Sequence, residues 1–264
     1  MIKIFLLVFL CLNLSAQEFV PAKFLGMGSS GYGSASLYTL STNPSGISRL
    51  TKPQIALAYQ QHFFGLDIQT QALFFAQPLP SIGNIGIYLQ NYGIPKVSSL
   101  LKSGVTYSTY FGSHINTSIS LNYHQYSVSS YLSARNWSVD LGFQYLFDQL
   151  YLGAVFKNIS KSTFSSDINE SIDQEMGFGM VYLLSSEINV LAEAKKVGTA
   201  RIVYTSGIQY VVHPQLSLRG GVSANPTKFY AGVGYMLKKF AVDIASSFHT
   251  QLGSSPQVAV AYEF

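Results

Sequence analysis

The sequence predicts an all-β protein: a transmembrane antiparallel β-barrel of about 14 strands whose N-terminal segment fills the lumen. Three observations predict it. Charged residues make up 11% of the 264 residues, whereas soluble globular domains contain about 25%. Apolar and polar residues alternate with a period of two almost to the end, as in half-buried strands. The first residues have the pattern of an export signal.

The export signal is expected over residues 1–16. A basic start precedes a nearly unbroken apolar run from Ile4 to Leu12, and the small residues Ser15 and Ala16 follow it. This run is too short for a transmembrane helix, which needs about 20 apolar residues. We expect the segment to be cleaved together with Cys11, the only cysteine, so a disulfide scaffold is excluded.

Residues 17–53 show no strand alternation and are predicted to form a plug, or hatch, in the lumen. The segment is rich in glycine from Gly26 to Gly33, and Asn43, Pro44 and Gly46 follow in a turn-forming sequence. A glycine-rich loop can also bind phosphate. No preceding strand or following Lys-Ser/Thr pair supports that interpretation.

Residues 54–264 are predicted to form the barrel, in about fourteen alternating runs of about 9–12 residues, the length of a tilted membrane-spanning strand. In the clearest run Trp137, Leu141, Phe143 and Tyr145 lie on one face, which we expect to contact lipid or a neighbouring protein. Short connections such as Lys238-Lys239 alternate with mostly longer ones. The longer set includes 92–101, 127–133, 158–173 and 249–255.

A soluble β-sandwich also alternates apolar and polar residues. Its outer face would need charged residues, whereas the polar face here consists mostly of Ser, Thr, Asn, Gln and Gly. The alternation also continues to the last residues, where Tyr262 and Phe264 resemble the C-terminal signal that the barrel-assembly machinery recognises. The prediction is a multi-pass barrel in the bacterial outer membrane, surrounded by its lipid, with both termini periplasmic.

The N-terminal motifs resemble one family. The stretch from Phe24 to Gly31, followed by Asn43-Pro44-Ser45-Gly46-Ile47, is similar to the start of the PorV/PorQ family of FadL-like, fourteen-stranded outer-membrane barrels of Bacteroidetes-type bacteria. The resemblance implies that Gly26, Gly28, Asn43, Pro44 and Gly46 hold the hatch. The alternative is that they only plug and stabilise the barrel, and we favour it.

The lumen is predicted to contain charges of both signs, which normally pair with one another or with the hatch. Aromatic and aliphatic side chains that would allow an apolar pocket are expected there too. Fourteen strands with a plug do not make the wide pore of a diffusive porin. The predicted inward charges are Asp67, Asp140, Glu175, Glu193, Arg201, Arg219 and Asp243, and the apolar candidates are Leu73, Phe75, Tyr88, Tyr110 and Tyr230.

No chemistry-bearing motif is evident. The five histidines lack metal-ligand spacing. Serines are too numerous for proximity to a histidine to identify a nucleophile, as a barrel phospholipase would require. We therefore predict no enzyme activity, no metal site and no cofactor. Lys and Arg are scattered, so nucleic acid is not an expected partner.

The predicted function is partner binding, as a non-catalytic subunit of a larger envelope assembly. The family resemblance implies type IX protein secretion. A FadL-like transporter of hydrophobic small molecules is the alternative, and a purely structural barrel is a third interpretation.

Overall fold

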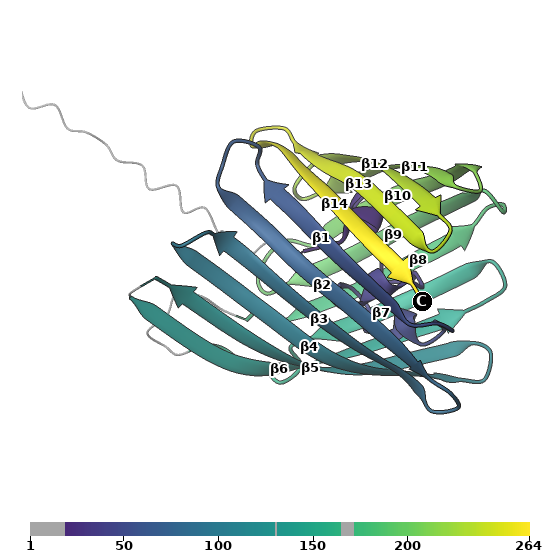
Figure 1. Ribbon diagram of the computed structural model, residues 1–264, viewed down its shortest axis with the longest axis horizontal. Helices are drawn as coiled ribbons and strands as arrows, with labels where there is room; N and C mark the ends of the chain where they lie inside the picture. Colours follow the sequence, from purple (N-terminus) through teal and green to yellow (C-terminus); the bar gives the residue numbers. More distant parts are fainter. Residues whose placement is uncertain (1–18, 130, 165–171) are drawn as a thin grey trace, which may run out of the picture.

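The computed structural model describes residues 19–129, 131–164 and 172–264, and the predicted signal peptide lies outside these ranges. Fourteen antiparallel strands form a closed barrel in which β1 pairs with β14, so the predicted fold is confirmed (Figure 1). The strands are β1 (Gln54–His62), β2 (Ile68–Leu79), β3 (Gly83–Ile94), β4 (Ser98–Phe111), β5 (Ile115–Val128), β6 (Leu132–Leu146), β7 (Leu150–Lys157), β8 (Glu175–Leu183), β9 (Ile188–Val197), β10 (Val203–His213), β11 (Leu216–Ala224), β12 (Lys228–Leu237), β13 (Phe240–His249) and β14 (Gly253–Glu263).

The two ends of the barrel differ. We call the end that carries Gln54 and Glu263 the terminal rim, where turns of two to four residues join the strands. The opposite end, the loop rim, carries the connections 63–67, 95–97, 129–131, 158–174, 198–202, 225–227 and 250–252. The predicted loops 92–101, 127–133 and 249–255 were too long. Their serines and other polar residues belong to strands that continue into the rim.

The barrel wall is higher on one side. β4 and β5 have 14 residues and β6 has 15, whereas β7 has only 8. The pairing of β6 with β7 begins at Leu141, opposite Phe156, so among the described residues the part of β6 towards the loop rim has no ladder partner on that side. Connection 158–174, the longest of the loop rim, begins at this step.

The outer face is apolar and the inner face is small or polar, as in outer-membrane barrels. Side chains of alternate residues such as Leu57, Leu121, Leu141 and Val260 are exposed, while their neighbours are buried. No helix within the described ranges is long and apolar enough to cross a membrane.

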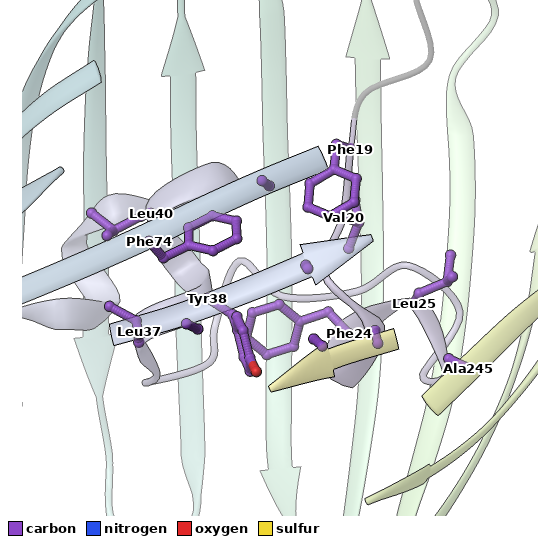
Figure 2. Close-up of a cluster of buried hydrophobic side chains, with 14 of the residues drawn as sticks. Phe19, Val20, Phe24, Leu25, Leu37, Tyr38, Leu40, Phe74 and Ala245 are labelled. Carbon is purple, nitrogen blue, oxygen red and sulfur yellow. The ribbon is translucent and has the colours of Figure 1, made fainter. Parts of the chain in front are cut away.

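The plug, residues 19–53, lies inside the barrel. It contains α1 (Ala22–Leu25) and two short 3-10 helices, η1 (Leu37–Ser41) and η2 (Pro44–Ile47). Its aromatic and aliphatic side chains form one buried cluster with small wall residues and with Phe74 of β2 (Figure 2). The small wall residues, among them Ala56 and Ala245, leave the space that these side chains fill. This core lies between plug and wall.

Candidate functional site in the barrel lumen

Two glycines bring the plug backbone against the wall. Gly26 lies against Gly232 of β12, and a side chain on either residue would reduce this contact. Gly28 has a φ of 75°, and a Cβ there would collide with the carbonyl oxygen of Ser206 in β10. Only glycine adopts this conformation without strain while leaving room for the wall.

The Asn43-Pro44 turn is connected by hydrogen bonds to both the plug and the wall. The Asn43 side chain donates to the carbonyl oxygens of Tyr32, at 2.8 Å, and Phe143, at 3.1 Å, and accepts from the Ser45 backbone. Pro44 begins η2, where a missing N–H has no cost. Gly46 packs against Ser34 and Thr39 within the plug. All three residues are therefore structural contacts of the buried plug.

Wall carboxylates hold the middle of the plug, whereas sequence alternation predicted only that Glu175 and Glu193 point inward. Glu193 accepts hydrogen bonds from the backbone N–H groups of Gly31 and Tyr32. Glu175 accepts from the Tyr32 hydroxyl at 2.6 Å and pairs with Lys157 at 3.1 Å. These bonds satisfy backbone donors that would otherwise be buried without partners.

Three of the five lumenal charges in the predicted network lie inside. Arg219 contacts Asp243 at 2.5 Å, and Asp140 lies 3.8 Å from Lys102 and accepts from the Asn158 backbone at 2.8 Å. Asp67 and Arg201 are corrections: both are exposed residues of the loop rim, outside β2 and β10. The inward–outward alternation ends with the strand, so it does not place them.

Only some of the predicted apolar lining residues face the lumen. Tyr88 and Tyr230 are buried on the inner face, and Tyr110 lies under the Arg49 guanidinium at the terminal rim. Leu73 and Phe75 are corrections. They face outward, because the buried residues of β2 are Thr70, Ala72, Phe74 and Ala76.

The loop side of the plug encloses a chamber of about 130 Å³. Phe19, Tyr88 and Leu100 provide apolar wall, while Phe164 and Ile172 of connection 158–174 are buried over it. Apart from Val197, the remaining lining is charged or polar and includes the pairs Lys102–Asp140 and Lys157–Glu175. Neither lysine was predicted from the sequence. Lys102 shares the inward parity of Thr106 and Ser108, the signal that could have identified it.

The chamber also contains a serine–histidine pair. His124 Nε2 and Ser138 Oγ lie 2.8 Å apart, and both residues are buried. Asp140, the nearby carboxylate of the lining, interacts with Lys102 and the Asn158 backbone. Nucleophilic catalysis requires a group that orients the histidine, and no hydrogen bond to His124 Nδ1 occurs among the described residues. The same ranges contain no cluster of metal-ligating side chains.

The predicted outer-surface residues all face outward. Trp137, Leu141 and Phe143 are exposed, and Tyr145 is half-buried between His114 and Phe147. At the terminal rim Tyr262 contacts Phe240 and Phe264. Whether Tyr262 and Phe264 direct insertion stays a prediction.

A closed fourteen-stranded barrel with an apolar outer face and a lumenal plug defines the class: the fold of FadL-like outer-membrane barrels. The chain is similar to the toluene transporter TodX of Pseudomonas putida, with a TM-score of 0.70, 14% identity, and 94% of this chain and 98% of that chain covered. The toluene transporter TbuX of Ralstonia pickettii gives a TM-score of 0.68 at 11% identity, with 94% of this chain and 98% of that chain covered. A FadL homologue of Pseudomonas aeruginosa gives a TM-score of 0.66 at 11% identity, with 93% of this chain and 98% of that chain covered. No family model and no curated protein matches the sequence.

Proposed function

We propose that this barrel takes up small hydrophobic molecules across the outer membrane. The observation that carries the proposal is the loop-side chamber, which lies between the plug, the wall and the side chains of Phe164 and Ile172 and combines apolar lining with paired charges. Concave sites of mainly apolar lining with a few placed polar groups are typical of small-molecule binding. The similarity to hydrocarbon transporters in fold supports the same interpretation.

The proposed entry path to the chamber runs past residues 158–164, which lie along the part of β6 that has no ladder partner among the described residues. The Ile159 N–H donates to the Val139 carbonyl at 2.9 Å, and the Asn136 side chain donates to the Thr163 carbonyl. Within the described ranges these few bonds take the place of a strand ladder, so movement of this segment would widen the way into the chamber. A molecule that enters here would meet Phe164 and Leu100 first.

A reversible disulfide tests this path. Asn136→Cys combined with Thr163→Cys would link the segment to β6, and the only native cysteine is Cys11 of the predicted signal. In a host that lacks its own hydrocarbon-uptake barrels, we expect wild type to raise the uptake of labelled toluene. The oxidised double variant should not, and reduction should restore uptake.

Each single-cysteine variant is the control, because it carries one of the two substitutions and cannot form the intramolecular link. Toluene uptake by the oxidised double variant at the wild-type rate would contradict this path. Uptake by cells with wild type that is no faster than by cells without it would contradict the transport function.

A second function, a subunit of an envelope assembly, is favoured by the outer face of the high side. At the loop rim, β2 to β5 form a hollow of about 390 Å³ lined by polar residues such as Gln69, Asn91, Ser99 and Ser127. Lipid tails would not favour these side chains, whereas a protein partner would. Together with the PorV/PorQ resemblance, this surface supports a place in type IX secretion.

Purification in mild detergent from the native membrane, followed by native mass spectrometry, separates the two functions. Envelope proteins that co-purify at fixed stoichiometry, and are lost on Asn91→Arg, would support the assembly. A lone barrel with a bound apolar molecule would support transport. An Arg201→Gln variant, exposed at the same rim but outside the lining of the hollow, is the control for a general change of surface.

A further inference from the structure

A second cavity lies at the terminal rim, between the plug and the inner face of β10 to β14. Its volume is about 380 Å³. The turn residues Gln215, Lys238 and Lys239 contribute to its lining, so it opens at this rim, whereas the loop-side chamber is lined by residues near the other rim. Its size suits a small organic molecule.

Lys23 of α1 places a positive charge in this cavity. Among the described residues it forms neither an ion pair nor a hydrogen bond, and it remains partly accessible. The neighbouring Arg219 is fully engaged: it contacts Asp243 at 2.5 Å and donates to Gln209 at 2.9 Å and Ser217 at 3.1 Å. The Lys23 ammonium therefore has no carboxylate of its own, because the nearby Asp243 is paired with Arg219.

A buried hydroxyl lines the same cavity. Tyr38 of η1 is 3% exposed, and its hydroxyl has no hydrogen-bond partner within the described ranges. The ring packs edge-on against Phe74 at 5.9 Å, with the hydroxyl at the edge of the apolar cluster (Figure 2). Buried polar groups are almost always hydrogen-bonded, so an unpartnered hydroxyl beside a cavity indicates a missing acceptor.

We propose that this cavity binds a small organic carboxylate. One ammonium and one hydroxyl donor match a single negative charge better than a phosphate dianion, because Arg219 is already neutralised by Asp243. Leu37, Leu50 and Met236 provide apolar lining for a short hydrocarbon body. The site is independent of the proposed transport function, since it lies at the other rim and shares no lining residue with the loop-side chamber.

The electrostatics of Lys23 agree with this ligand. Burial and the nearby Arg219 guanidinium lower the pKa of Lys23, while Asp243 only partly offsets them. A bound carboxylate would stabilise the ammonium form of Lys23, which burial and Arg219 disfavour.

The test uses benzoate as the probe and benzamide as its uncharged match, titrated calorimetrically into the purified full-length barrel in a non-ionic detergent. We expect saturable binding of benzoate and at least about tenfold weaker binding of benzamide. Lys23→Gln should weaken benzoate binding about tenfold, and Tyr38→Phe should weaken it about threefold. These are the usual ranges for the loss of a charged and of a neutral hydrogen-bond partner. Lys96→Gln, at the loop rim, is the matched control and should bind as wild type does.

A measurement on wild type keeps the test valid if Lys23→Gln does not fold. Benzoate should protect Lys23, but not Lys96, from acetylation measured by mass spectrometry. The proposal is overturned if benzoate does not bind or if benzamide binds equally well. It is also overturned if benzoate binding does not depend on Lys23 and does not protect Lys23 from acetylation.

Discussion

Gly28 shows how a single residue sets the fit between plug and wall. Its φ of 75° disfavours any side chain, and the Ser206 carbonyl occupies the place of a Cβ. Both effects act at once, because the plug is enclosed by the barrel and cannot move away from the wall. The glycine is therefore needed for conformation and for space.

Gly28→Ala should destabilise the folded barrel by about 3 kcal/mol, the sum of left-handed strain and overpacking. Gly65→Ala is the matched control: Gly65 also has a positive φ, but nothing lies within 4 Å of a Cβ there, so about 1 kcal/mol is expected. Unfolding titrations in lipid measure both changes. Equal losses would show that the contact with Ser206 has no effect.

Leu141 tests the outward face of β6. It is 39% exposed and alternates with buried Asp140 and Gly142. Leu141→Arg should cost roughly 2–4 kcal/mol, because the charge enters the lipid-facing band. Ser133→Arg, on the same face of the same strand but at the loop rim, should cost about 0–1 kcal/mol. A lipid refolding titration compares the two, and a Leu141→Arg variant as stable as wild type would contradict the register.

At the level of elements, β9 anchors the plug through one side chain. The Glu193 carboxylate accepts the N–H groups of Gly31 and Tyr32, which belong to no strand. Removal of the carboxylate leaves two buried donors without an acceptor, and each such donor costs about 1–3 kcal/mol.

Glu193→Ala should therefore loosen the plug while the barrel stays closed. We expect amide hydrogen exchange at Gly31 and Tyr32 to accelerate by at least about tenfold, with little change in β4 and β5. Glu187→Ala at the exposed terminal rim is the control. Unchanged exchange at both plug amides would mean that other contacts hold this segment.

Much of the barrel could be predicted because alternation is a local property. Trp137, Leu141 and Phe143 follow each other with a strict period of two, and the structure places all three outward. The prediction failed where this pattern ends. The run Leu73-Phe74-Phe75-Ala76 is apolar at every position, so parity could not be assigned, and Asp67 lies beyond the strand.

The contacts of the lumen could not be predicted in the same way. The contact between Gly28 and Ser206, and the bonds of Glu193 to Gly31 and Tyr32, join residues more than 150 positions apart. Period-two alternation indicates that Glu193 faces inward, but not which backbone it meets. The terminal-rim cavity is lined by plug residues and by wall residues that are far apart in the sequence, so no sequence pattern indicates it.

At the level of the whole molecule, the two rims give the barrel a direction. We infer that the terminal rim, with its short turns and both chain ends, faces the periplasm, as is typical of outer-membrane barrels. An epitope inserted after Lys161 should be labelled by antibody on intact cells, whereas an epitope after Phe264 should be labelled only after permeabilisation. The reverse labelling pattern would show that the terminal rim faces the outside of the cell.

The pairing of β1 with β14 also has a consequence for the order of assembly. Pro53 leads directly from the plug into β1, and the Phe264 N–H donates to the Pro53 carbonyl where the first and last strands meet. Gly28 and Gly26 place the plug backbone against β10 and β12 with no room for a side chain. We infer that the plug docks before this seam closes, so that the pairing of β14 with β1 completes an enclosure that is already filled.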